Sequence, residues 1–202
     1  MELALDLTKQ YTYADYLTWM DDKTRELING FINMMSAPRR IHARVSHKIS
    51  YHLEIILTKN KGKCEVYPAP FDVRFPKNGE TEDNKIYTVV QPDICVICDL
   101  SKLDKRGCCG APDMIVEVLS PSTNKRDFND KFNLYEEHGV KEYWIVNPDL
   151  KTINVFLLQE NGKYDDGTIY ELEERLENNL EAKIPIHIFG DYKIDLNDIF
   201  DI

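Results

Sequence analysis

Hydrophobic spacing along the chain predicts one long helix followed by several strands. In "RIHARVSHKISYHLEIILTK", apolar residues recur every four positions from Ile41 to Leu57, which predicts an amphipathic helix over about residues 40–58. The stretches "CEVYPAPFDVRF", "IYTVVQPDICVICD" and "PDMIVEVLS" are rich in β-branched and apolar residues and predict three strands. Prolines interrupt the regularity of the first two strands.

Local start and stop signals complete the expected order of elements. A capping box at Thr12 predicts a short helix through about Met20, and the Asn-Gly dipeptide of "RELINGFINMM" predicts a hairpin. A second amphipathic helix is expected over residues 127–138, ended by Gly139, and "KEYWIVNP" and "TINVFLLQ" predict two more strands. The central order is α-β-β-β-α-β, which predicts an α/β fold with helices packed against a sheet.

The 202 residues are expected to form a single domain with a sizeable core. We expect an N-terminal helix and hairpin over about 11–35, a core over about 40–150, and a C-terminal extension with additional strands over 151–202. No apolar run approaches the roughly 20 residues of a membrane span. The start "MELALDLTKQ" lacks the basic region of a secretory signal. We therefore expect a cytoplasmic protein without membrane contact.

Five cysteines, an odd number, favour a reducing compartment over a disulfide framework. Cys95-x-x-Cys98 followed by Cys108-Cys109 superficially resembles a zinc site. However, residues three apart on a strand face opposite sides, and the second pair lacks the spacing of a structural zinc site. We therefore do not expect zinc.

Charge is unevenly distributed along the chain. The formal net charge of −10 opposes DNA binding by bulk electrostatics. Residues 36–63 nevertheless carry seven Lys and Arg against one acid, whereas residues 160–202 carry twelve acids against four bases. The basic segment is either a solvated helix face or a surface that faces a polyanion, and the sequence leaves both interpretations open.

Glu117 interrupts the otherwise apolar strand "PDMIVEVLS". An unpaired buried charge costs several kcal/mol, so this carboxylate needs a cation, a hydrogen-bond shell or a metal ion. Asp93 directly precedes the apolar residues of the neighbouring predicted strand and can converge with Glu117 if the two strands pair. Two carboxylates and a main-chain carbonyl would form a hard-oxygen site suited to Mg²⁺.

A cation is expected on the helix that follows. Lys131 shares a helical face with Phe128 and Tyr135, so it points along the apolar face rather than away from it. Three structural interpretations remain open: a snorkelling lysine, a pair with Asp127, or a plain salt bridge to Glu117.

The stretches "QPDICVICD", "GAPDMIVEVLSPSTNKRDFNDKFNLYEEHGVKEYWIVNP" and "RELINGFINMM" resemble the Uma family of restriction endonuclease-like proteins, within the PD-(D/E)XK nuclease superfamily. The resemblance extends from about Tyr11 through the final "IDLNDIF". It implies the restriction endonuclease-like core and an endonuclease that uses Mg²⁺ (or Mn²⁺) to hydrolyse phosphodiester bonds of DNA. Double-strand cleavage would require two such sites, so a homodimer is expected.

The resemblance also implies roles for individual residues. Asp93 corresponds to the aspartate of the "PD" element and Glu117 to the acid of the E-x-K element, and both would bind the metal together with the Val118 carbonyl. This chain departs from the pattern because Leu119 stands where the lysine of that element belongs. The departure leaves open the alternative of a catalytically inactive nuclease-fold module that binds nucleic acid or protein.

The missing lysine has two candidate replacements. The resemblance favours Lys131, on the helix, over Lys125, which lies before the helix. Glu26 matches the glutamate of the family's hairpin, and His42 matches a histidine that opens the next helix. We treat Glu26 and His42 as supporting candidates, with a purely structural role as the alternative for each.

Overall fold

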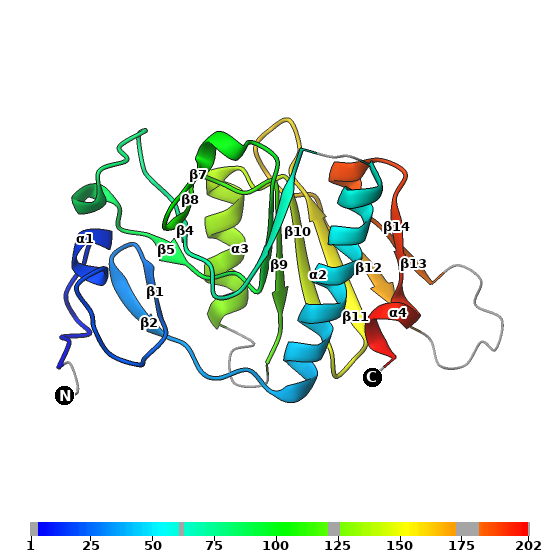
Figure 1. The fold of residues 1–202 in the computed structure, drawn as a ribbon, viewed down its shortest axis with the longest axis horizontal. Helices are drawn as coiled ribbons and strands as arrows, with labels where there is room; N and C mark the ends of the chain where they lie inside the picture. The colour runs from blue at the N-terminus through cyan, green and yellow to red at the C-terminus, as the bar shows by residue number, and fades with distance from the viewer. Residues whose placement is uncertain (1–3, 61–62, 121–125, 173–181, 202) are drawn as a thin grey trace.

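The computed structural model describes residues 4–60, 63–120, 126–172 and 182–201, with backbone alone for Asn60 and residues 126–128. Two six-stranded sheets and a two-stranded ribbon make up the β-structure of these residues. Figure 1 shows the two sheets side by side, with α3 between them and α2 on the outer face of one sheet.

The core sheet has the strand order β12-β11-β10-β9-β6-β3, in which β9 and β10 are parallel and the other neighbours are antiparallel. Its strands are β3 (Glu65–Pro68), β6 (Ile94–Ile97), β9 (Met114–Val118), β10 (Glu142–Asn147), β11 (Thr152–Leu157) and β12 (Thr168–Glu171). Helices α2 (Arg40–Asn60) and α3 (Arg126–His138) pack on its opposite faces. The sequence α2-β3-β6-β9-α3-β10 is the predicted α-β-β-β-α-β core, so the predicted fold class is confirmed.

A second sheet, with the order β2-β1-β5-β4-β8-β7, covers the other side of α3. Its strands are β1 (Arg25–Ile28), β2 (Phe31–Met34), β4 (Val73–Arg74), β5 (Val89–Val90), β7 (Leu103–Asp104) and β8 (Gly107–Cys109). Apolar side chains of β4, β5 and α3 join the core sheet in one hydrophobic cluster. The two sheets are therefore held together through α3.

Two of the predicted strands each divide between the sheets, which the sequence did not indicate. "CEVYPAPFDVRF" supplies β3 to the core sheet and β4 to the second sheet, and "IYTVVQPDICVICD" supplies β5 and β6. Proline explains both breaks because it has no N–H to donate to a ladder. Pro68 ends β3, and Pro92 lies between β5 and β6. At the second break the chain leaves strand β5 of the second sheet, and Asp93 lies just before it enters β6 of the core sheet.

The predicted hairpin and capping box are confirmed, but the first helix is shorter than expected. Asn29 and Gly30 have φ of +52° and +85°, as a type I′ turn requires. Thr12 caps α1 (Tyr13–Tyr16), which ends well before Met20. The next amides bond three residues back rather than four, Thr18 to the Asp15 carbonyl at 2.9 Å. Hydrogen bonds of this 3₁₀ type are common at the ends of α-helices, and here they end α1.

The C-terminal elements pack on the α2 side of the core sheet and complete its hydrophobic cluster. They are β13 (Lys183–Pro185), the 3₁₀ helix η3 (His187–Phe189), β14 (Lys193–Asp195) and α4 (Leu196–Phe200). The remaining short 3₁₀ helices are η1 (Asp83–Lys85) and η2 (Leu100–Lys102). The predicted C-terminal extension thus includes part of the core as well as an edge of the sheet.

The cysteines depart from expectation at one position. Cys64 and Cys98 form a disulfide, with Cα atoms 3.9 Å apart. The antiparallel pairing of β3 with β6 explains their proximity, because continuing the register beyond Glu65 and Ile97 places the two cysteines opposite each other. Cys95 lies free and buried on the other face of the sheet. Among the described residues, no group of three or more His, Cys, Asp or Glu side chains is arranged to hold a metal ion.

Candidate active site

Asp93 and Glu117 lie on adjacent strands at the same end of the core sheet. β6 and β9 pair antiparallel with Ile94 opposite Val116, and one further step of this register sets Asp93 opposite Glu117. The Val118 amide donates to Asp93 Oδ2 at 2.7 Å, which ties the aspartate to the end of β9. Strand pairing therefore brings together the two acids that the sequence singled out.

Lys131 reaches both Glu117 and the hairpin glutamate. Its Nζ lies 2.9 Å from Glu117 Oε1 and 2.9 Å from Glu26 Oε1, and its side chain is only 9% exposed. Of the three structural interpretations, the salt bridge to Glu117 is thus present, with a second acid added. Lys125 and the side chains of Asp127 and Phe128 lie outside the described residues.

Glu26 and His42 also lie in this cluster. Glu26, on β1, is buried, and its Oε1 accepts from the Gln91 amide at 2.9 Å. His42, in the first turn of α2, places Nε2 at 3.2 Å from Asp93 Oδ2. Its Nδ1 is buried without a hydrogen-bond partner in the described part of the chain. The hairpin and the long helix therefore contribute one side chain each from opposite sides.

Burial and neighbouring charges shift the pKa values of this cluster in a consistent direction. Burial raises the pKa of Glu117, and the charges of Asp93 and Glu26 add to this, while Lys131 and a hydrogen bond from Tyr135 oppose it. Burial lowers the pKa of Lys131, but the two glutamates outweigh it and raise that pKa well above its usual value. Lys131 therefore stays protonated, while the raised pKa of Glu117 shifts this carboxyl towards its neutral, protonated form.

His42 is biased towards the charged form. Burial lowers the pKa of His42, but the hydrogen bond and charge of Asp93, with the charge of Glu117, outweigh it and raise that pKa. Among the described residues, three carboxylates thus face one lysine and one histidine, so when all three are ionised their negative charges outnumber the positive ones. A buried excess of negative charge favours a bound cation.

The donor set fits a hard divalent cation. Asp93 and Glu117 offer carboxylate oxygens, and Val118 directly follows Glu117 and donates its amide to Asp93. Mg²⁺ and Mn²⁺ prefer oxygen ligands, and Mg²⁺ usually keeps several waters, so two carboxylates and a carbonyl suffice without a third acidic side chain. Leu119 is partly buried against apolar neighbours and offers no polar group.

Tyr135 belongs to the cluster although the sequence did not single it out as a site residue. Its hydroxyl donates to Glu117 Oε1 at 2.6 Å, and the side chain is fully buried. The available signal was its helical phase, since Tyr135 follows Lys131 by four residues and shares its face. The hydroxyl's partner could not be read from the sequence, because it lies on a strand eighteen residues away.

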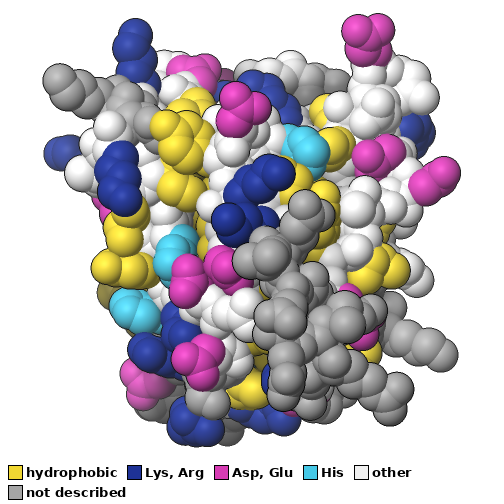
Figure 2. Space-filling view, turned by 90° about the vertical axis from the view of Figure 1, so that its right-hand side faces the viewer, with side chains coloured by type: hydrophobic (Ala, Val, Ile, Leu, Met, Phe, Trp, Pro, Cys, Tyr) yellow, Lys and Arg dark blue, Asp and Glu magenta, His cyan; other side chains and the backbone are white. Residues whose placement is uncertain are grey.

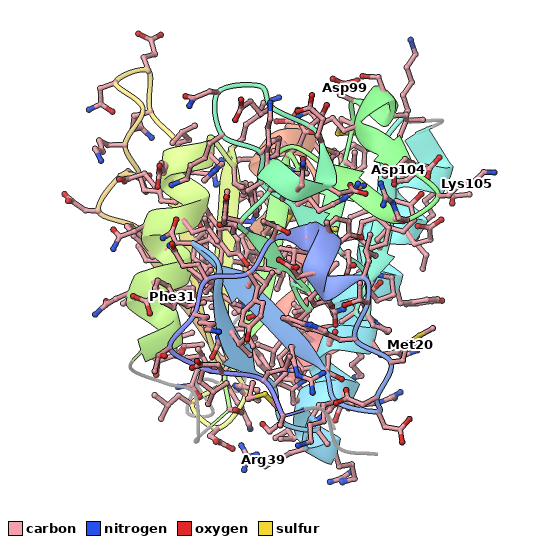
Figure 3. The ribbon with its side chains drawn as sticks, turned by 90° about the vertical axis from the view of Figure 1, so that its left-hand side faces the viewer. Met20, Phe31, Arg39, Asp99, Asp104 and Lys105 are labelled. Atoms are coloured by element: carbon pink, nitrogen blue, oxygen red, sulfur yellow. A yellow bond between two sulfur atoms is a disulfide. The ribbon has the colours of Figure 1, made fainter. Side chains whose placement is uncertain are left out.

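Basic residues at the start of α2 lie at the same end of the molecule as His42. Arg40 and Arg44 are exposed, and Arg39 pairs with Asp149 at 2.9 Å. Figure 3 shows Arg39 below the β1–β2 hairpin that carries Glu26. Lys48 instead donates to the Asp201 carbonyl. On the face that carries α2 and the C-terminal elements, basic and acidic side chains are interspersed (Figure 2), so this face as a whole is not a continuous basic surface.

The comparisons with known proteins agree with this architecture. Over 95% of its length, the chain superimposes on 98% of a crystal structure titled as a "putative nuclease belonging to DUF820" from Anabaena variabilis, with a TM-score of 0.72 and 18% identity. It is 27% identical over 176 residues to an uncharacterized protein of Synechocystis, slr1290, covering 84% of this chain and 83% of that protein. The structural match establishes the fold.

A family model identifies the family itself. The model of the Uma2 family, described as "Putative restriction endonuclease", matches residues 13–185. The match includes the hairpin, α2, both acidic strands and α3, so it spans every side chain of the cluster. The chain belongs to the Uma2 family of restriction endonuclease-like proteins.

Proposed function

We propose that this protein is a Mg²⁺-dependent endonuclease that hydrolyses phosphodiester bonds of DNA. Asp93, Glu117 and the Val118 carbonyl would hold the ion, and Lys131 would act beside it. The observation that carries the proposal is the position of Lys131 Nζ, 2.9 Å from Glu117 Oε1, which restores from α3 the cation that Leu119 does not supply. Family membership supports the nuclease class.

The protein groups have separable tasks in this reaction. A bound Mg²⁺ would supply an acidic water and neutralise charge on the scissile phosphate. Lys131 has three N–H donors, of which Glu117 and Glu26 accept two among the described residues. The third can donate to the attacking water or to a phosphate oxygen. Because its pKa is raised, Lys131 acts as a fixed positive charge that stabilises the transition state rather than as a base.

The start of α2 is the proposed DNA contact. Arg40 and Arg44 are exposed beside the helix turn that carries His42, so a backbone phosphate held there would lie near the ion. Reversing both to glutamate should weaken DNA binding and flatten its salt dependence, because fewer counterions are released. The matched control reverses two other exposed lysines, Lys59 near the far end of α2 and Lys63 just beyond that helix. Equal losses in both variants would assign the effect to net charge.

One site of this kind cuts one strand. Cleavage of both strands would therefore require two copies of the chain or two successive visits, and we propose a homodimer on this ground. Sedimentation analysis of the protein with and without a DNA duplex would show whether two copies assemble.

A non-catalytic nuclease-fold module is the second candidate. The observation that favours it is the double ion pair of Lys131, which partly compensates Glu117 and Glu26 without a metal. In that case the cluster would serve stability, and the chain would bind nucleic acid or protein without cutting it.

Cleavage of supercoiled, linear and branched DNA distinguishes the two candidates. The wild type should cut with Mg²⁺ or Mn²⁺ and stop when EDTA is added. Asp93→Ala should lower the rate by about a hundredfold or more. Asp99→Ala is the control, since Asp99 lies just beyond the opposite end of β6 and is exposed. If the wild type cuts no DNA or RNA offered with either metal, the non-catalytic module is the better account.

A further inference from the structure

The hydrogen bonds of the two strand acids are distributed unequally between their oxygens. Lys131 and Tyr135 both donate to Oε1 of Glu117. The Val118 amide and His42 both contact Oδ2 of Asp93. Within the described residues, Oε2 of Glu117 and Oδ1 of Asp93 receive no hydrogen bond. Among the described residues, each acid is therefore held through one oxygen, and the other oxygen is the one that would face a ligand.

We propose that Tyr135 is a positioning residue that holds Glu117 through Oε1, so that Oε2 is presented to the divalent cation. The inference rests on the proposed metal site. Lys131 cannot fix the carboxylate alone, because its ammonium is shared with Glu26 and carries no directional plane. A second donor on the same oxygen, approaching from the next helical turn, restricts rotation of the carboxylate about its last torsion.

The surroundings of Tyr135 explain the precision of this contact. Its ring packs edge-on against Tyr143, with the ring centroids 5.0 Å apart, and lies 6.0 Å from the ring of Phe75. Four residues after Tyr135, Gly139 adopts a φ of +81°, and the next amide, that of Val140, donates a hydrogen bond to the Tyr135 carbonyl at 3.0 Å. This C-cap fixes the last turn of α3. Ring and backbone are thus both held, and the hydroxyl has one orientation towards Glu117.

A second tyrosine of the same aromatic cluster provides the matched comparison. Tyr164 is also buried, and its hydroxyl donates to the Val140 carbonyl at 2.9 Å. It therefore loses a hydrogen bond of similar length when changed to phenylalanine, but one that touches no acid of the site. A phenylalanine would fill the space of either ring, so both variants are expected to fold.

The test measures Mn²⁺ affinity without DNA, by calorimetry and by the electron paramagnetic resonance signal of free Mn²⁺. Groups that orient metal ligands typically change affinity by 10- to 100-fold when removed, so Tyr135→Phe should weaken Mn²⁺ binding by about tenfold. Tyr164→Phe should stay within about twofold of the wild type. Thermal melting of both variants controls for the loss of a buried hydroxyl, which a purely structural tyrosine would share.

The outcomes separate this inference from the proposed function. If Tyr135→Phe binds Mn²⁺ as tightly as the wild type, while Asp93→Ala does not, the metal site stands and the role of Tyr135 is refuted. Equal weakening in Tyr135→Phe and Tyr164→Phe would also refute it. If the wild type binds no better than Asp93→Ala, the metal site and this inference both fail. Weakening in Tyr135→Phe alone supports the inference even if no DNA is cut.

Discussion

Glu117 and Glu142 lie on neighbouring parallel strands, the first partly buried and the second fully buried, and their surroundings differ. Glu142, at the start of β10, is fully buried on the α2 face of the sheet. Both of its oxygens accept a hydrogen bond from a neutral donor, Oε1 from the Trp144 indole at 2.8 Å and Oε2 from the Ile188 amide at 2.8 Å. Glu117 faces α3 and accepts on Oε1 alone within the described residues, from a lysine and a tyrosine.

The difference separates a structural acid from a candidate ligand. Burial raises the pKa of both carboxyls, so a perturbed pKa does not distinguish them. What distinguishes them is the neighbouring charge: Asp93 and Glu26 lie near Glu117, whereas Glu142 fastens η3 to the sheet with both oxygens used. An acid with a spare oxygen beside other acids can bind a cation, and an acid with every oxygen bonded stabilises the fold.

The largest expected effect comes from removing the cation beside Glu117. Lys131→Met should lower kcat by about a hundredfold or more with little loss of DNA affinity, because the charge acts mainly in the transition state. Methionine keeps the apolar stem, so the variant should remain folded. Single-turnover cleavage and DNA binding are measured for each variant.

Two lysines control this prediction. Lys141→Met removes an exposed lysine that pairs with Asp113 at 2.7 Å, at the other end of β9, and should leave kcat unchanged. Lys125→Met tests the competing lysine. Normal cleavage by Lys131→Met together with an inactive Lys125→Met would show that Lys125 supplies the catalytic charge.

Exchanging each glutamate for its neutral isostere should give opposite results. Glu117→Gln should abolish Mg²⁺-dependent cleavage, because an amide is a poor metal ligand, and should change the free energy of unfolding little. Glu142→Gln should keep cleavage but lower the free energy of unfolding by about 1–3 kcal/mol. The glutamine NH₂ group would face a donor, either the Trp144 indole N–H or the Ile188 amide, where an oxygen of Glu142 now accepts. Denaturant unfolding and plasmid cleavage are measured on both. Similar profiles for the two variants would remove the distinction between them.

Asp113 offers a smaller, pH-dependent test of a third buried carboxylate. Burial alone would raise its pKa, but hydrogen bonds from Lys141 and the Cys98 amide outweigh this and hold the pKa below its usual value. Its contribution to stability is therefore present above the unfolded-state pKa, about 3.9, and is lost as pH falls through the folded-state pKa. Asp113→Asn should cost about 1–2 kcal/mol at pH 7 and progressively less below pH 4. A cost that does not change with pH would assign the effect to packing.

Much of the core could be predicted from the sequence, because its signals are local. The spacing of apolar residues identified α2, the Asn-Gly dipeptide identified the hairpin, and Gly139 identified the end of α3. The division of two predicted strands between two sheets could not be predicted, since a proline marks a break without saying where the chain goes next. The Cys64–Cys98 disulfide depends on the register of β3 and β6, which one sequence does not define.

The candidate site was predictable in its residues and less so in its contacts. The misfit of a carboxylate in an apolar strand pointed to Glu117. Strand pairing and helical phase then pointed to Asp93 and Lys131, and the resemblance to a nuclease family added Glu26 and His42. The structure brings these side chains together. No local pattern encodes the long-range packing of the second sheet, which contains the β1–β2 hairpin, against α3. The contact between Glu26 and Lys131 depends on that packing.

Diffraction from crystals soaked in Mn²⁺, recorded at a wavelength where manganese scatters anomalously, tests the central claim most directly. The account predicts one anomalous peak at about 2.0–2.3 Å from one oxygen each of Asp93 and Glu117, near the Val118 carbonyl, with Lys131 still beside Glu117. No peak should lie near Glu142. A cluster without a peak in crystals that bind Mn²⁺ elsewhere, or one in which Glu117 contacts only Lys131 and Tyr135 at saturating Mn²⁺, would contradict the account.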